Sequence, residues 1–159
     1  MRQPRKLKKE EKMSPAVDRN DPYRNNHFLV EIDGMASASF LSVQGIETAT
    51  EVIDYRNGNE DSVPRRLPGL HKCANITLRR GLTNNRDLWE WRLTVVEGRT
   101  ERRNGLVVVL DQARRPVLRL SFREAWPCRW SLSGMDALAK ETIIEEIELV
   151  VEGLRLEVG

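Results

Sequence analysis

The chain has 159 residues, of which 40% are hydrophobic and 31% are charged. This length fits one domain with a sizeable core, and no apolar run approaches the roughly 18 residues that a membrane helix needs. The formal net charge is only +2, and the basic residues that cause it crowd the N-terminus. The remainder therefore lacks the composition of a basic nucleic-acid-binding domain.

Residues 1–20 are predicted to form a disordered basic extension, because Lys, Arg and Glu dominate and large apolar side chains are nearly missing. Two alternatives stay open: the extension docks on an acidic surface, or natural translation starts at Met13. The extension has no apolar stretch of the kind found in secretory signals, so we expect a chain that is not exported. The folded domain is expected over residues 21–159.

Three short strands are predicted at the start of this domain. Phe28, Val30 and Ile32 alternate with other residues before Gly34, and residues 40–43 and 46–55 are further strand-like runs rich in Val, Ile and Thr. Because glycines separate these runs, the pattern indicates a meander, in which strands adjacent in sequence pair with each other.

Residues 56–68 show no apolar periodicity and include the turn signal Asn57-Gly58. Such a segment is longer than most connections, and long loops in compact domains are often functional. A mobile surface loop and an arm that contacts a partner are equally compatible with it. Pro68-Gly69 is predicted to be a turn.

A strand is predicted after this turn, with Ala74, Ile76 and Leu78 on one face and Gly81 at its end. One amphipathic helix is then expected over about residues 84–97, with Asn84 as N-cap and Gly98 as the stop signal. Its apolar residues recur at helical spacing and are predicted to pack in the core. They include Leu88, Trp89, Trp91 and Val95.

The C-terminal part reads as further strands. Residues 106–110 are continuously apolar and indicate a buried strand. Residues 118–122 alternate cleanly, Trp126-Pro127 is predicted to interrupt that strand, and residues 130–132 continue it. The last segment fits a helix or a strand. Its many β-branched residues favour a strand, and the shift of the apolar phase at Gly153 predicts a bulge.

No catalytic, cofactor or metal site is predicted. His27 and His71 lie in no metal-binding motif, and His71 with Cys73 lacks the further ligands that zinc requires. No nucleophile or phosphate-loop motif is present in the sequence, so we expect no enzyme. Cys73 and Cys128 are far apart in sequence and are predicted to be free thiols, with a disulfide as the alternative.

Arginine doublets recur along the chain. Because adjacent strand residues point to opposite faces, a doublet cannot place both side chains in the core. The doublets are therefore read as solvated strand ends or, alternatively, as partners of carboxylates on another subunit. A second functional hypothesis, a small nucleic-acid-binding module, would use them together with the basic tail. They are Arg65-Arg66, Arg79-Arg80, Arg102-Arg103 and Arg114-Arg115.

From about Asp21 to Gly159 the chain resembles phage tail tube proteins, in particular tube subunits of contractile tails and of phage-like bacterial injection particles. The order of five segments carries the resemblance: DPYRNNHFLVEIDG, VIDYRNG, RRLPGLHKCANITLRRGLTNNRDLWEW, ERRNGLVVVLD and FREAWPCRW. The chain departs from this family in its long basic extension. That extension would line the lumen or mark a specialised ring near the baseplate or terminator.

The resemblance implies a mainly β fold, a barrel or sandwich of short antiparallel strands with a single helix packed on its side, shared with type VI secretion tube proteins. It also implies homo-hexameric rings that stack into a tube inside a sheath. Expected partners are sheath, baseplate or spike, and terminator proteins, with protein or DNA cargo in the lumen. Assembly is expected in the bacterial cytoplasm; a phage, a bacteriocin and an injection system all remain open.

The resemblance assigns one role to specific residues. The segment that matches residues 56–68 is an arm that contacts the neighbouring ring or subunit. The arm residues expected on this basis are Arg56, Asn57, Gly58, Asn59, Glu60, Asp61, Arg65, Arg66, Leu67 and Pro68.

Overall fold

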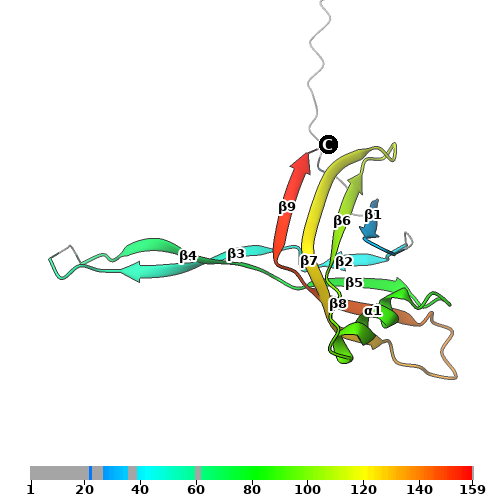
Figure 1. Ribbon diagram of the computed structural model, residues 1–159. Helices are drawn as coiled ribbons and strands as arrows, with labels where there is room; N and C mark the ends of the chain where they lie inside the picture. The colour runs from blue at the N-terminus through cyan, green and yellow to red at the C-terminus, as the bar shows by residue number, and fades with distance from the viewer. Residues whose placement is uncertain (1–21, 23–26, 36–38, 60–61, 159) are drawn as a thin grey trace, which may run out of the picture.

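The computed structural model describes residues 22, 27–35, 39–59 and 62–158. The predicted extension, the boundary after residue 20 and the alternative start at Met13 lie outside these ranges. The described chain contains nine strands and one helix (Figure 1). They are β1 (Phe28–Ile32), β2 (Ser42–Gln44), β3 (Thr48–Tyr55), β4 (Arg65–Cys73), β5 (Ile76–Gly81), α1 (Asp87–Val96), β6 (Arg103–Leu110), β7 (Pro116–Leu132), β8 (Ile144–Val150) and β9 (Gly153–Val158).

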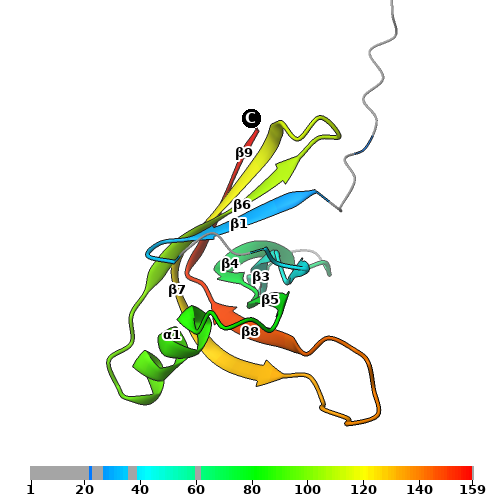
Figure 2. The same ribbon diagram turned by 90° about the vertical axis from the view of Figure 1, so that its right-hand side faces the viewer.

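The body of the protein consists of two antiparallel layers that share the long strand β7. The first half of β7 pairs with β6 and β9, and β6 pairs with β1; we call this the first layer. The second half of β7 pairs with β8, which is followed by β5 and β2; we call this the second layer. Figure 2 shows the two layers diverging from β7.

The mainly β prediction with a single helix is confirmed, and the sandwich alternative fits. A closed barrel is wrong, because the strand path of the described chain ends at β1 on one side and at β2 on the other. The predicted meander is wrong as well. β1 pairs with β6, β2 with β5 and β3 with β4, so the first two strands find partners far along the chain.

Two irregularities let the chain pass from one layer to the other. In β7, Glu124 has a φ of 54°, and the register with β8 shifts between Pro127 and Arg129. The predicted interruption at Trp126-Pro127 is therefore a bend inside one continuous strand. At the C-terminus, the predicted strand is confirmed. The bulge predicted at Gly153 is wrong, because β8 of the second layer ends at Val150 and Gly153 begins a separate strand, β9, of the first layer.

The core lies between the layers and consists of inward-facing apolar side chains. Ile76, Leu78, Ile147 and Leu149, from the paired strands β5 and β8, are fully buried. The ring of Phe122 packs directly on the backbone of Gly105, where an added Cβ atom would lie 2.1 Å from the ring. The first layer thus depends on a glycine for close contact between β6 and β7.

Local hydrogen bonds mark both ends of the helix α1. The predicted N-cap Asn84 is wrong: Arg86 is the N-cap and makes no side-chain capping bond, while Asn85 Oδ1 accepts from the backbone N–H of Asp87 (2.8 Å). The predicted stop at Gly98 is confirmed, because this residue has a φ of 75° and its N–H bonds to the carbonyl of Val95. No helix in the described ranges is long and apolar enough to cross a membrane.

Candidate subunit interface

The most exposed secondary structure of the described chain is the hairpin of β3 and β4, which projects away from both layers (Figure 1). We call residues 48–73 the arm. All eight residues of β3 are exposed. Six large apolar side chains of the arm are 45–76% exposed: Val52, Ile53, Tyr55, Val63, Leu67 and Leu70. A solvent-facing apolar group of this size indicates a surface for contact with another protein.

Cross-strand pairs give the arm its shape. Ile53 lies opposite Leu67, so the two apolar side chains share one face of the hairpin. On the other face, Asp54 lies opposite Arg66, and the two form an exposed ion pair of 3.5 Å. Closer to the body, the Thr50 hydroxyl and the ring atom Nδ1 of His71 are 2.8 Å apart. These local contacts define the register of the hairpin without a core beneath it.

The root of the arm is fixed tightly to the body. Gly45 has a φ of 81°, and a Cβ atom there would lie 2.0 Å from the backbone oxygen of Asn75. Just beyond it, the N–H of Ala74 bonds to the carbonyl of Glu47 (3.0 Å). Only glycine tolerates both this backbone conformation and this close approach. The direction in which the arm leaves the body is therefore set by the body itself.

The structure divides the predicted arm residues between two positions. Arg56, Asn57, Gly58 and Asn59 follow β3 at the tip, where the Tyr55 hydroxyl donates to Asn57 Oδ1 (2.5 Å). Glu60 and Asp61 lie outside the described residues.

The remaining four, Arg65 to Pro68, belong to β4 rather than to a loop. The predicted turn at Pro68-Gly69 is wrong, because Pro68 pairs with Val52 within the hairpin. A proline is tolerated in an edge strand, where the missing N–H would have faced solvent and no ladder hydrogen bond is lost.

Sequence reasoning assigned residues 56–68 to the arm and missed residues 48–55 and 69–73. Residues 48–55 carry the β-branched and aromatic composition of a strand, which does not reveal whether the strand has a core to pack on, and residues 69–73 contain no β-branched residue at all. A weak signal was present: Glu47, Glu51 and Asp54 interrupt this run at intervals that leave neither face purely apolar.

A second candidate surface is formed by the open edges of the first layer. In the described chain, β1 pairs on one side only, with β6, and β9 pairs on one side only, with β7. Apolar side chains accompany both edges: Leu29 is 52%, Leu156 58% and Val158 81% exposed. Unprotected edges of this kind present backbone donors and acceptors to another strand.

The second layer, in contrast, has one covered edge. The helix α1 packs beside the second half of β7, and Arg92 donates to the carbonyl of Pro127 (3.4 Å). Leu88 and Trp91, predicted for the helix core, are both buried.

The other two predicted helix residues are less enclosed. Val95 is half-buried, and Trp89 is 39% exposed, with its ring centroid 4.7 Å from that of Trp130. In the described chain the first layer thus has two unpaired edges, whereas the second layer has one, at β2.

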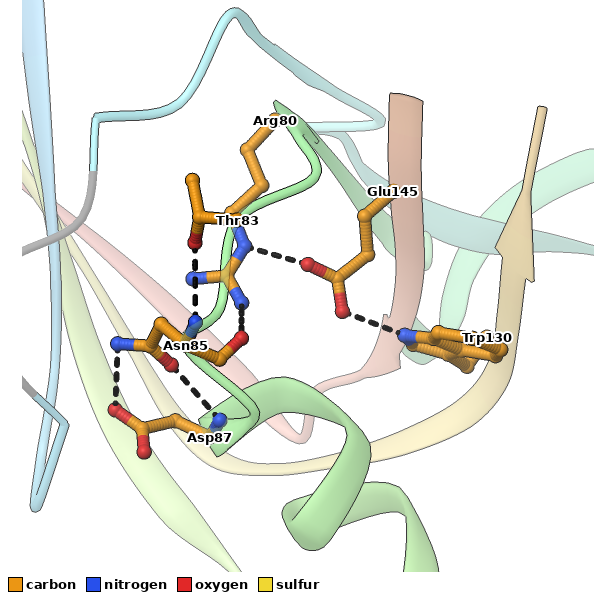
Figure 3. Close-up of polar contacts among 6 residues, drawn as sticks. All are labelled: Arg80, Thr83, Asn85, Asp87, Trp130 and Glu145. Carbon is orange, nitrogen blue, oxygen red and sulfur yellow. Dashed lines mark hydrogen bonds and ion pairs between the residues drawn. The ribbon is translucent and has the colours of Figure 1, made fainter. Parts of the chain in front are cut away.

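A buried ion pair anchors the helix to the second layer (Figure 3). Arg80 Nε donates to Glu145 Oε2 (2.6 Å), and both side chains are at least 95% buried. The second carboxylate oxygen accepts from Trp130 Nε1 (2.8 Å), and Arg80 also donates to the carbonyl of Asn85 (3.1 Å). The network joins β5, β8 and β7 to Asn85, whose side chain accepts a hydrogen bond from the first N–H of α1, so both buried charges have hydrogen-bonding partners.

Most of the arginine doublets pair within the chain rather than forming a basic patch. Besides Arg80, Arg79 contacts Glu146 (3.3 Å), Arg102 contacts Glu152 and Arg103 contacts Glu101 (3.0 Å). Arg115 contacts Asp111 (2.9 Å). Because acidic partners neutralise these side chains, the doublets give no support to a nucleic-acid-binding surface.

Asp111 and Cys128, both among the described residues, have pKa values shifted by their surroundings. A hydrogen bond from the backbone of Arg115 lowers the pKa of Asp111, as expected for a carboxylate in a turn. Burial, followed by the nearby Glu148 carboxylate, raises the pKa of Cys128, so this thiol is less reactive than a free one. Both cysteines are free, and the described residues contain no group of side chains that could hold a metal ion.

A model of the T4-like virus tail tube protein gp19 family matches residues 24–155 of the chain. No curated protein sequence matches it. Among solved structures, a chain of the PVC sheath-tube complex in the extended state, from an extracellular contractile injection system, is 22% identical. The alignment covers 88% of this chain and 94% of that one, with a TM-score of 0.79.

Two further structures share the fold. A chain of the anti-feeding prophage tube terminating cap is 20% identical over 91% of this chain and 99% of that one, with a TM-score of 0.78. Hcp1 from Flavobacterium johnsoniae is 15% identical over 84% and 96% of the respective chains, with a TM-score of 0.55. The overall fold of this chain is thus shared with these solved structures.

Proposed function

The chain belongs to the T4-like virus tail tube protein family, and we propose that it is the inner-tube subunit of a contractile, phage-tail-like injection particle. In this proposal, subunits join into rings, and the rings stack into a hollow tube. The family is one of structural proteins, in keeping with a subunit that performs no catalysis.

The observation that carries this proposal is the pair of open edges on the first layer. Along the order β1, β6, β7, β9 each strand runs antiparallel to the next. β1 and β9 therefore run in opposite directions, and β9 of one subunit can pair in an antiparallel sense with β1 of another. Every subunit then offers one edge and accepts one, a head-to-tail contact that forms a closed ring.

The arm supplies the contact between rings. It has no core of its own, its apolar face is exposed, and the body fixes its direction at Gly45. The residues assigned to this contact are those predicted for the arm, together with the remainder of β3 and β4. We expect sheath, baseplate or spike, and terminator proteins as further partners, and protein or DNA cargo in the lumen.

Assembly in the bacterial cytoplasm, hexameric ring symmetry and a domain that begins near residue 21 belong to the same proposal. A chain of the anti-feeding prophage baseplate, in a six-fold symmetrised structure, shares the fold with a TM-score of 0.76. This likeness supports the six-fold ring. The basic extension would line the lumen or mark a ring at one end of the tube.

The ring contact is tested by charging the edge of β9. In Leu156→Lys, a side chain that is 58% exposed becomes charged, so the subunit should fold while ring formation is lost. Leu138→Lys is the matched control, because Leu138 is 92% exposed and lies away from both edges, between β7 and β8. Size-exclusion chromatography with light scattering should give rings for wild type and control only. Rings of unchanged mass in Leu156→Lys would contradict the proposal.

A further inference from the structure

The first layer has one side that no other element of the described chain covers. Figure 2 shows the second layer and α1 together on the opposite side. We call the uncovered side the free face. Side chains alternate along each strand, and Phe122 of β7 points to the core, so its two neighbours point to the free face. The polar members of this face are Glu31, Arg119, Ser121, Arg123, Arg155 and Glu157.

Two arginines of the free face lack an acidic partner. Arg119 and Arg123 are exposed and form no ion pair with a described residue. Glu157 lies opposite Arg119 in the register but contacts Arg155 instead (3.3 Å). Glu31 lies on β1 and is separated from β7 by β6. The free face thus carries three arginines against two glutamates, with its positive charge concentrated on β7 and β9.

A hollow of about 500 Å³ lies between β6, β7 and β9, with Arg123 and Arg155 in its lining. Of the described residues that line it, only Glu124 is acidic. The side chain of Arg123 lies across Gly153, where an added Cβ atom would be 2.4 Å from Nε. The bare backbone of this glycine therefore leaves room for the guanidinium beside the hollow. A guanidinium presents paired N–H donors that match the two oxygens of a carboxylate.

Apolar side chains lie next to these arginines. Val108 is only 7% exposed but lies outside the core cluster, because it faces Arg119 across the free face. Leu29, opposite Val108 on β1, is 52% exposed. A nucleic-acid backbone is bound chiefly through its phosphates, which the glutamates of this face would repel. A mixed surface of arginine and apolar side chains is instead typical of contacts between proteins.

We propose that the free face binds an acidic protein segment, and that this segment belongs to the cargo of the tube. The inference rests on the proposed function. In a ring closed through β1 and β9, the second layer and α1 need the wider circumference, because both lie on one side of the first layer. The free face then lines the lumen. Each subunit repeats the same arginines, so individually weak contacts add up along the cargo.

Binding of a fluorescein-labelled oligoglutamate peptide to full-length tubes tests the proposal. The peptide should sediment with wild-type tubes at low salt. The double variant Arg119→Glu, Arg123→Glu inverts both unpaired charges, and we expect at least tenfold less bound peptide. The neutral variant Arg119→Gln, Arg123→Gln repeats the test without a like-charge row in the lumen. It should bind less peptide than wild type and more than the inverted variant.

The matched control makes the same change in net charge away from the free face. It combines Arg86→Glu, at the N-cap of α1, with Lys140→Glu, between β7 and β8; both side chains are exposed. This control should bind the peptide as wild type does. A labelled single-stranded DNA oligonucleotide is the second probe and should sediment with wild-type tubes much less than the peptide.

The outcomes separate this inference from the proposed function. Tubes that are intact by electron microscopy but bind no peptide, or bind it equally in the inverted and control variants, overturn the inference and leave the tube subunit standing. Stronger binding of the DNA, lost in the inverted variant, would assign the free face to nucleic acid and overturn the inference as well. A wild-type protein that forms neither rings nor tubes overturns the proposed function, and the inference with it.

Discussion

The chain uses the same pair of side chains, arginine and carboxylate across two antiparallel strands, in two different settings. In the body, Arg80 of β5 faces Glu145 of β8, and both are almost completely buried. In the arm, Arg66 of β4 faces Asp54 of β3, and their side chains are 72% and 64% exposed. In both pairs the arginine lies directly opposite the carboxylate on the neighbouring strand, but only the pair in the body is shielded from solvent.

The difference indicates which part of the molecule stabilises the folded subunit and which part is available for contacts between subunits. The body buries its ladder under apolar side chains and a helix, so its ion pair is shielded from water and from salt. An isolated two-stranded hairpin is marginally stable in water, and the arm has only exposed pairs to hold it. We infer that the body makes the subunit fold, whereas the arm gains its stabilisation from a neighbouring subunit.

The largest loss of stability is expected from breaking the buried pair. Glu145→Ala leaves the guanidinium of Arg80 and the indole N–H of Trp130 without their acceptor. An uncompensated buried charge costs about 3 to 5 kcal/mol, and chemical denaturation of the purified subunit measures this. Glu146→Ala is the matched control: this residue is adjacent, faces the other side of β8 and pairs with the partly exposed Arg79. It should cost less than about 1 kcal/mol; equal losses would remove the distinction between the two faces.

A smaller loss of subunit stability is expected at Gly105, where β6 and β7 of the first layer are closely packed. In Gly105→Ala the new methyl group would lie 2.1 Å from the Phe122 ring, so the strands or the ring must move. Overpacking of this kind costs about 1 to 3 kcal/mol. Gly134→Ala is the control, because nothing lies within 4 Å of its added Cβ atom. A thermal melt in which both variants match wild type would show that this contact is not tight.

Substitutions in the arm are expected to have a large effect on tube assembly and almost none on the stability of the subunit. The double variant Ile53→Ser, Leu67→Ser removes the apolar pair from one face of the hairpin. Because both side chains are already about half exposed, unfolding of the subunit should change by no more than about 0.5 kcal/mol per site. Tubes seen by electron microscopy should be lost. Normal tubes together with a destabilised subunit would show that the arm stabilises the subunit and is not needed for assembly.

The smallest effect is expected for the exposed ion pair. Asp54→Asn removes the carboxylate that contacts Arg66, and exposed pairs contribute about 0 to 1 kcal/mol. Salt should weaken even this contribution, because solvent-exposed charges are screened. Denaturation at low and high salt measures it. A loss as large as that of Glu145→Ala would show that the arm carries subunit stability.

Local patterns predicted the elements well, because they depend on nearby residues. Alternation located β1 and β5, helical spacing located α1, and Gly98 marked its end. In each case the physical cause, a buried face or a left-handed backbone, lies within a few residues of the signal.

Pairing across the chain was not predictable in the same way. Short strands separated by glycines indicate a meander, yet β1 pairs with β6 because tertiary packing, not proximity, selects the partner. In the arm, residues 46–55 were predicted as a strand, but residues 56–68 were predicted as a loop, because a strand without a core beneath it shows no apolar alternation. The buried pair had a visible signal: Arg80 is in phase with Ile76 and Leu78, and Glu145 is in phase with Ile147 and Leu149. Two opposite charges on two apolar faces indicate that the faces meet.

The central claim, that this subunit is built to assemble, is tested most directly by the mass of the purified full-length protein in solution. Light scattering combined with electron microscopy should find particles of about six times the 18.3 kDa subunit mass, or stacks of them. A folded monomer that persists at high concentration, without rings or tubes, would contradict the account.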